Sequence, residues 1–210
     1  MTPLLLIVLT LAGDLESARD IQDRAALEKL AAQAAKTGPP FKAALAYSYL
    51  ATVAQEQRDK GAAKRAAEAG IPFAQKAIEQ SPDAEHYRIL GTLYGQVIPA
   101  APLAGLSYGK KSKDAIAKAL EKDPKSAMIY VSRGVGSFYM PEPFGGGVNL
   151  AIADFQKAIE LNPKLDEAHL WLGLALRKAG RNADARKSLQ KALDLNPRRA
   201  WIKQQLDKTS

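Results

Sequence analysis

The sequence of 210 residues contains no cysteine and only two histidines, His86 and His169. Without cysteine the chain has no disulfide, no catalytic thiolate and no zinc site with cysteine ligands. Neither histidine has other histidines or carboxylates around it at metal-ligand spacing. No elbow motif accompanies a serine, histidine and aspartate set. These absences argue against an enzyme and against a metal, and no cofactor is expected.

Long apolar runs are also missing from the sequence. Residues 1–13 have an apolar core of about nine residues, whereas a membrane-spanning helix needs about 20. The run matches the hydrophobic region of a secretory signal, with Thr10, Leu11 and Ala12 as the cleavage site, although no Lys or Arg precedes it. We therefore expect residues 1–13 to be a signal peptide and the mature chain to be periplasmic, without a stable membrane span. The alternative is a first packed helix in a cytoplasmic protein.

The charge of the chain is positive but dispersed. There are 30 Lys and Arg against 22 Asp and Glu, which gives a formal net charge of +8. Basic residues alternate with acidic ones, as in Lys157 with Glu160 and Arg186 with Asp184. This pattern favours solvated helix faces over a clustered basic surface, so nucleic acid is not the expected partner.

Between clusters of glycine and proline the sequence is rich in alanine, leucine, lysine, glutamate and glutamine, which favours helices throughout. Asp166–Pro197 is the most regular stretch and reads as two amphipathic helices closed by Asn196 and Pro197. The step from Pro163 to Pro197 is 34 residues. That period predicts a helical hairpin repeat.

The same punctuation divides the whole chain. We expect a single domain over residues 14–210, with an N-terminal cap hairpin over residues 14–40 and a C-terminal cap helix over residues 198–210. Four repeats lie between them, at residues 41–82, 83–124, 125–163 and 164–197. The second and third repeats span 42 and 39 residues instead of 34. Their excess falls in Gln96–Gly109 and Met140–Gly147, which are predicted to be extended turns inside the hairpins.

Tyr87, Leu90, Gly91 and Tyr94 occupy the aromatic, leucine, glycine and tyrosine positions of the tetratricopeptide pattern. On these residues the chain resembles the tetratricopeptide-repeat superfamily over Tyr47–Ser210. It has a narrower likeness to exported bacterial tetratricopeptide proteins and a fainter one to the regulator-of-microtubule-dynamics proteins. The resemblance implies an all-α, right-handed α-solenoid whose first helices form a concave wall. It also implies a scaffold that binds a protein or peptide, and not an enzyme.

The inward positions of such a groove follow from the repeat register. The residues expected there are Arg88, Thr92, Val131, Val135, Leu170 and Leu174, with Phe138, Tyr139, Phe144, Arg177 and Lys178 further along. The arginines of this set would hold carboxylates, and Tyr139 and Phe144 would supply stacking contacts. One alternative is a small-molecule-binding or enzyme-accessory protein with the two extended turns as a lid. A second is a structural homo-oligomer that pairs through an exposed terminal helix.

Three local features have more than one reading. Gly105–Ser112 has only a faint likeness to a phosphate-binding loop, one residue short and without a preceding strand, so we interpret it as a long turn with a basic helix start. Gly145–Gly147 either exposes backbone amides to an anion or simply turns the chain. Arg133 stands where the repeat pattern has leucine, so it is paired internally, extended outward or directed at a ligand.

Overall fold

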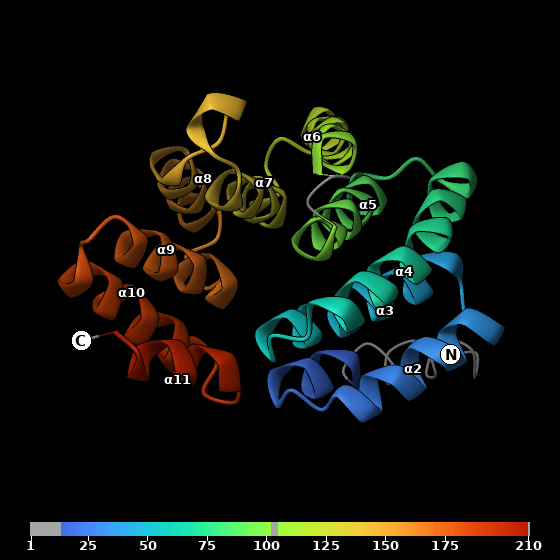
Figure 1. Ribbon diagram of the computed structural model, residues 1–210, viewed down its shortest axis with the longest axis horizontal. Coiled ribbons are helices and arrows are strands. Elements are labelled where there is room, and N and C mark those ends of the chain that lie inside the picture. Colours follow the sequence, from blue (N-terminus) through green and yellow to red (C-terminus); the bar gives the residue numbers. More distant parts are fainter. Residues whose placement is uncertain (1–13, 102–104, 210) are drawn as a thin grey trace. The chain divides into compact units, whose positions relative to one another are not determined.

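The computed structural model describes residues 14–101 and 105–209 (Figure 1). These residues form helices joined by turns, with no strand among them. The chain divides into two compact units, Met1–Ser112 and Lys113–Ser210, which we call unit 1 and unit 2. The division falls inside one helix, α6 (Gly105–Lys122). The predicted signal peptide, residues 1–13, lies outside the described residues.

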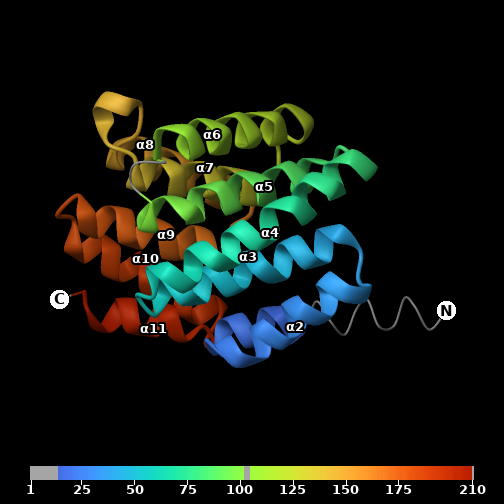
Figure 2. The same cartoon turned by 45° about the vertical axis from the view of Figure 1, so that its right-hand side comes forward.

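Unit 1 is built from helices that pack on their neighbours in sequence. Residues 14–20 are helical, and the helices that follow are α2 (Arg24–Thr37), α3 (Pro40–Glu56), α4 (Lys60–Gln80) and α5 (Ala84–Val97), then the short 3₁₀ helix η1 (Ile98–Ala100). Helix α3 packs against both α2 and α4, and α4 packs against α5. Figure 2 shows α2, α3 and α4 side by side.

Aspartates cap three helices of unit 1. The carboxylates of Asp23 and Asp59 each accept a hydrogen bond at 2.9 Å, from the backbone N–H of Ala26 and of Ala62. Asp83 caps α5 in the same way. Such a cap satisfies a backbone donor that has no partner inside the helix, and it stabilises the helix by about 1 kcal/mol.

The core of unit 1 consists largely of alanine. Helix α3 alone buries Ala43, Ala44, Ala46, Ala51 and Ala54, and α4 adds six more alanines. Small side chains let the axes of packed helices approach closely, and they lose little side-chain entropy on folding. The hairpin of α3 and α4 is therefore held by close backbone packing more than by large side chains.

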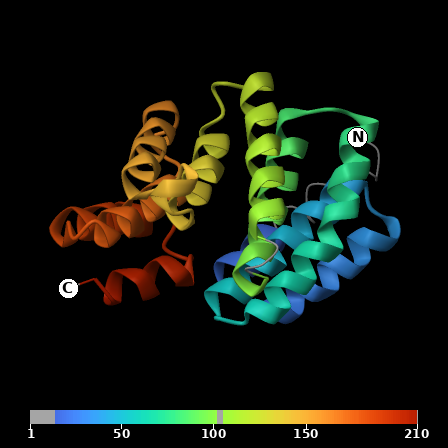
Figure 3. The ribbon, with the colours of Figure 1, turned by 45° about the horizontal axis from the view of Figure 1, so that its top comes forward.

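Unit 2 continues the hairpin pattern with larger side chains. After the end of α6 come α7 (Ala127–Tyr139), η3 (Glu142–Phe144), α8 (Val148–Leu161), α9 (Asp166–Lys178), α10 (Asn182–Leu195) and α11 (Ala200–Asp207). Each helix from α7 to α10 packs on the next. The α9–α10 hairpin and α11 can be followed in orange and red in Figure 3.

Two glycines in the first helices of the unit 2 hairpins lie where the second helix approaches closely. A Cβ atom at Gly134 would lie 2.5 Å from the ring of Phe155, and one at Gly173 would lie 2.6 Å from Cγ of Leu189. Phe155 and Leu189 are fully buried. Glycine is thus needed wherever the second helix of a hairpin places a large side chain directly against the first.

The two turns that were expected to be extended differ in the structure. Most of Gln96–Gly109 is helical, because α5 reaches Val97 and α6 already begins at Gly105. The ring of Tyr108 packs 5.8 Å from that of Tyr94, and the Ser112 hydroxyl donates to the backbone oxygen of Gly91 at 2.7 Å. These contacts hold the first turns of α6 against α5. The second segment, Met140–Gly147, is a turn that contains η3.

Candidate functional site

Five aromatic side chains from four helices meet in unit 2, and we call them the aromatic cluster. They are Phe138 and Tyr139 of α7, Phe155 of α8, Trp171 of α9 and Trp201 of α11. The ring centre of Trp171 lies between 5.5 and 6.2 Å from the ring centres of the other four. Edge-on and tilted contacts at such distances are favourable for aromatic pairs. Trp171 therefore fixes the position of its neighbours.

Part of this cluster is open to solvent. Tyr139, the last residue of α7, is 64% exposed, and Phe144 in the following turn is 62% exposed. Leu150 is 52% exposed. In the part of the chain that the structure describes, only one other large apolar side chain, Ile21, is exposed in this way. A concentration of exposed apolar side chains on one segment is typical of an interaction surface.

The turn between α7 and α8, residues 140–147, has a defined conformation. The N–H groups of Gly145, Gly146 and Gly147 donate to the backbone oxygens of Glu142, Pro141 and Ser137 at 2.9–3.2 Å. Gly145 and Gly147 have φ values of 78° and 116°, which side chains other than hydrogen rarely permit. The glycines therefore serve to turn the chain, and their amides are used inside the turn and are not offered to an anion.

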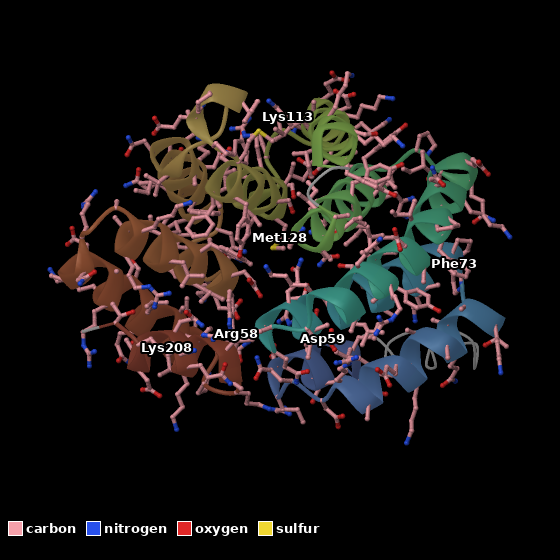
Figure 4. All side chains as sticks on the ribbon, in the orientation of Figure 1. Arg58, Asp59, Phe73, Lys113, Met128 and Lys208 are labelled. Carbon is pink, nitrogen blue, oxygen red and sulfur yellow. The ribbon has the colours of Figure 1, made fainter. Side chains whose placement is uncertain are left out.

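Two lysines lie beside this turn. The Nζ atom of Lys178 is 4.4 Å from the ring centre of Phe138 and donates to the backbone oxygen of Phe138 at 2.5 Å. This contact ties the end of α9 to the end of α7. Lys113 of α6, labelled in Figure 4, places its Nζ atom 3.4 Å from the position that a Cβ of Gly145 would take. Both lysine side chains are exposed.

The two arginines of unit 2 that the sequence singled out have internal partners. Arg177 donates to the Thr209 hydroxyl and to both oxygens of Gln205 at 2.9–3.2 Å, so it holds α11 against α9. Arg133 binds the carboxylate of the buried Asp154 through three contacts of 2.6–3.1 Å. These hydrogen bonds raise the pKa of Arg133. Of the three readings of Arg133, pairing within the hairpin is the one that the structure shows.

The predicted apolar groove positions of unit 2 are mostly core residues. Val131, Leu170 and Leu174 are buried in its two hydrophobic clusters. Val135 is half-buried against the first of them. The reason lies in the register: the positions one and five residues after the aromatic place point toward the second helices and α11. Phe138 and Trp171 of the aromatic cluster pack against these hydrophobic clusters.

Arg88 and Thr92 belong to unit 1, where they lie on α5. Arg88 is only 6% exposed, and its Nε atom donates to Glu85, one turn earlier in the same helix, at 2.6 Å. The Thr92 hydroxyl is buried, and the described residues offer it no hydrogen-bond partner. The carboxylate that Arg88 was expected to bind is therefore supplied, in this structure, by its own helix.

Unit 1 also contains a cleft between α2, α3 and α4 with a volume of about 230 Å³. Tyr47, Leu50 and alanines of α3 and α4 line it, together with the charged residues Arg24, Glu28 and Arg65. Arg24 is already bound to Asp59 and Glu28. Sites for small molecules usually measure about 300–1,000 Å³, so this cleft gives little support to the small-molecule alternative.

Other forms of chemistry find no site in the described ranges. Residues 105–112, which resemble a phosphate loop, are the first turns of α6. Residues 14–101 and 105–209 contain no group of three or more His, Cys, Asp or Glu side chains that could hold a metal ion. Over the same residues, every helix is too short or too polar to cross a bilayer.

Sequence reasoning missed the residue at the centre of the site. Trp171 contacts every other member of the aromatic cluster, yet only Phe138 and Tyr139 of that cluster were predicted as site residues. The available signal was composition: the chain has two tryptophans, and both lie in this cluster. Tryptophan is common at the energetic centres of interfaces, which makes its position informative.

Comparison with known protein families gives one match along almost the whole chain. The family described as Regulator of microtubule dynamics protein 1-3 matches residues 9–208. No curated protein sequence matches the chain.

Solved structures similar to this one include tetratricopeptide proteins. A thermophilic tetratricopeptide protein of Thermus thermophilus aligns with a TM-score of 0.64 and 16% identity, over 98% of this chain and 95% of that one. The first tetratricopeptide domain of Spaghetti (RPAP3), bound to an HSP90 peptide, aligns with a TM-score of 0.51 and 19% identity, over 61% of this chain and 94% of that one. PilF of Pseudomonas aeruginosa aligns at 0.51 and 18%, over 81% and 68%. The predicted all-α tetratricopeptide fold class is confirmed.

Proposed function

Because the chain belongs to the regulator of microtubule dynamics protein 1-3 family and has a tetratricopeptide fold, we propose that it is a non-catalytic scaffold that binds a protein segment. The observation that supports this most is the aromatic cluster of unit 2, whose outermost ring, Tyr139, is 64% exposed. The family description names microtubule dynamics as the process that its members regulate. From the family description we adopt only a regulatory role without catalysis for this chain.

The geometry of the cluster suits the binding of an extended segment. Tyr139 and Phe138 meet at right angles with 5.0 Å between their ring centres, and both rings pack against Trp171. Rings held in this way lose little conformational entropy on binding, which favours affinity. A partner side chain that packs on them gains about 0.5–1.5 kcal/mol from aromatic contact in addition to the burial of apolar area.

The other predicted contact residues enter the proposal with different roles. Phe144 and Lys178 flank the exposed rings and contact the segment directly. Arg88 and Arg177 contact a carboxylate of the partner only by exchanging the partners that they have in the free protein, Glu85 and Gln205. Val131, Val135, Leu170 and Leu174 act through the core, as does Thr92 of α5, whose hydroxyl is buried.

Two further elements of the proposal concern organisation and location. We propose that residues 14–210 form one tetratricopeptide domain and that residues 1–13 direct export to the periplasm. N-terminal sequencing of the protein recovered from cells tests the second element. A mature chain that begins near Asp14 supports export, and an intact Met1 contradicts it.

Affinity capture with matched variants tests the proposed function. The tagged protein, its Tyr139→Ala variant and its Ile21→Ala variant are used to retain proteins from the native envelope, and mass spectrometry identifies them. Ile21 is a suitable control because it is an exposed apolar residue of unit 1. We expect a partner that the unaltered chain and Ile21→Ala retain and Tyr139→Ala loses. An identical set of retained proteins for all three contradicts the proposal.

A further inference from the structure

The charges around the α7–α8 turn indicate what kind of segment unit 2 binds. We infer that the partner segment is acidic, that it carries aromatic or other large apolar anchors, and that the α7–α8 turn forms part of its docking surface. This inference rests on the proposed function and specifies the chemistry of its partner. Three sets of observations carry it: the exposed rings, the fixed turn and the lysines on either side.

Two exposed rings lie at the α7–α8 turn. Tyr139 ends α7 and Phe144 ends η3, five residues later, and each is more than 60% exposed. The hydrogen bonds of the glycine amides hold the backbone between them in one conformation. Because Phe144 is presented on a fixed turn, burying it against a partner adds apolar contact without the cost of ordering a loop.

Unit 2 carries an excess of positive charge. Unit 2 has 17 Lys and Arg against 11 Asp and Glu, a net charge of +6, and Lys113 and Lys178 flank the turn. The one acidic side chain in the turn is Glu142. Its Oε1 atom lies 3.2 Å from the position of a Gly147 Cβ, at the N-terminus of α8, where the helix dipole favours a negative charge.

The charges around the turn favour an acidic partner segment over a basic one. The carboxylate of Glu142 lies near the start of α8, where the helix dipole favours a negative charge, and the carboxylate of Asp154 is bound by Arg133. Lys178 keeps two further N–H donors beside its contact with Phe138, and a carboxylate can accept them. An acidic segment therefore meets favourable charges on both sides of the exposed rings, while a basic segment meets repulsion.

A protein segment fits these observations better than a lipid surface. Insertion into a bilayer interface requires an apolar tip, but the tip of this turn also carries the carboxylate of Glu142 beside Phe144. Tyr139 packs edge-on against Phe138 and Trp171 and is still 64% exposed, so a partner segment can pack on it near the ends of α7 and α9. A segment can follow such a surface from Phe144 to Lys178.

Two synthetic peptides test the inference by fluorescence anisotropy with the full chain. In the first, pairs of glutamates separate single phenylalanines, and in the second every glutamate is replaced by glutamine. We expect the glutamate peptide to bind about 10-fold more tightly at low salt, and this difference to shrink as salt is added. Equal affinity for the two peptides overturns the inference.

Matched variants locate the binding site. Lys113→Glu is expected to weaken binding of the glutamate peptide several-fold. Lys208→Glu makes the same charge change at the opposite end of unit 2, as labelled in Figure 4, and is expected to have a much smaller effect. Phe144→Ala is expected to weaken binding of both peptides, with Ile21→Ala as its control. Equal effects of the two lysine variants overturn the inference.

The outcomes also separate this inference from the proposed function. If Tyr139→Ala abolishes the binding of both peptides but glutamate and glutamine bind equally, the inference fails and the proposed function stands. If the chain binds phosphatidylserine vesicles through Phe144 and binds neither peptide, a lipid surface replaces the protein segment and the inference is overturned. If peptides bind and Tyr139→Ala has no effect, the proposed function itself fails.

Discussion

Unit 1 and unit 2 build the same kind of helical hairpin from different side chains. In unit 1 the buried residues of α3 and α4 are mostly alanines, and aspartates cap α2, α4 and α5. In unit 2 the core contains Phe155 and a cluster of leucines, and none of the helices α7 to α11 has a side-chain hydrogen bond at its N-cap. The net charges also differ: 13 basic against 11 acidic residues in unit 1, and 17 against 11 in unit 2.

The difference shows how a repeat array can separate stability from binding. Alanine packing and aspartate caps stabilise unit 1 through backbone approach and helix ends, and they leave few large apolar groups at the surface. In unit 2 each aromatic side chain of the core buries more apolar surface than an alanine does. The outermost rings of the aromatic cluster remain exposed. Such rings are available to a partner without any change in the core beneath them. Four substitutions test this difference between the two units.

The largest effect is expected from Phe155→Ala in unit 2. Phe155 is fully buried, stacks on Trp171 and fills the space left by Gly134, so its removal leaves a cavity. We expect a loss of about 3–5 kcal/mol in the free energy of unfolding. Urea unfolding followed by tryptophan fluorescence reports on unit 2 directly, because both tryptophans lie there. Phe73→Ala at a half-buried position of unit 1, measured together with Phe155→Ala by circular dichroism in the far ultraviolet, should cost clearly less, and equal losses would contradict the comparison.

The next effect is expected from Ala51→Leu in unit 1. Ala51 of α3 is fully buried and does not line the cleft between α2, α3 and α4. A larger side chain there forces the helices apart, at a cost of about 1–3 kcal/mol. Circular dichroism in the far ultraviolet, followed during urea unfolding, measures it. A midpoint that stays unchanged would show that the alanines are not closely packed.

A smaller effect is expected from acid acting on Asp59. Hydrogen bonds from the N–H of Ala62 and from Arg24 lower the pKa of Asp59 below the usual value of about 3.9. Because the pKa is lower in the folded state, the stabilisation is complete above about pH 4 and is lost as the pH falls through the lower folded-state value. Asp59→Asn should flatten the acid dependence of unfolding measured by circular dichroism. An unchanged acid limb would argue against the cap, which Figure 4 labels at the start of α4.

The smallest effect on stability is expected from Tyr139→Ala. An exposed residue at a helix end usually contributes within about 0.5 kcal/mol, so the unfolding midpoint should barely move. Partner affinity should nevertheless fall by about 10-fold or more, as for other aromatic residues at the centres of interfaces. Thermal unfolding and binding, measured on the same preparation, check the two halves of this prediction. A folded variant with normal affinity contradicts it.

The fold could be predicted from the sequence because the repeat depends on local features: the 34-residue step, Gly134 and Gly173 against large partners, and prolines after each second helix. The site could be predicted only in part. Tyr139 and Phe144 stood out because they are aromatic residues at a turn. The hydrogen-bond partners of Arg177, by contrast, lie 28 and 32 residues further along the chain, and no local sequence pattern predicts these contacts. Residues 105–109 are helical, and Tyr108 among them contacts Tyr94, which is likewise a tertiary contact.

The most direct test of the account is the intrinsic fluorescence of Trp171 and Trp201 during titration with the glutamate and phenylalanine peptide, which contains no tryptophan. Both indole rings belong to the aromatic cluster, so the emission reports on the proposed surface and on no other part of the chain. We predict a saturable change in emission that follows the anisotropy of the labelled peptide and disappears in Tyr139→Ala. Peptide binding that leaves the emission unchanged would contradict the claim that the aromatic cluster of unit 2 is the binding surface.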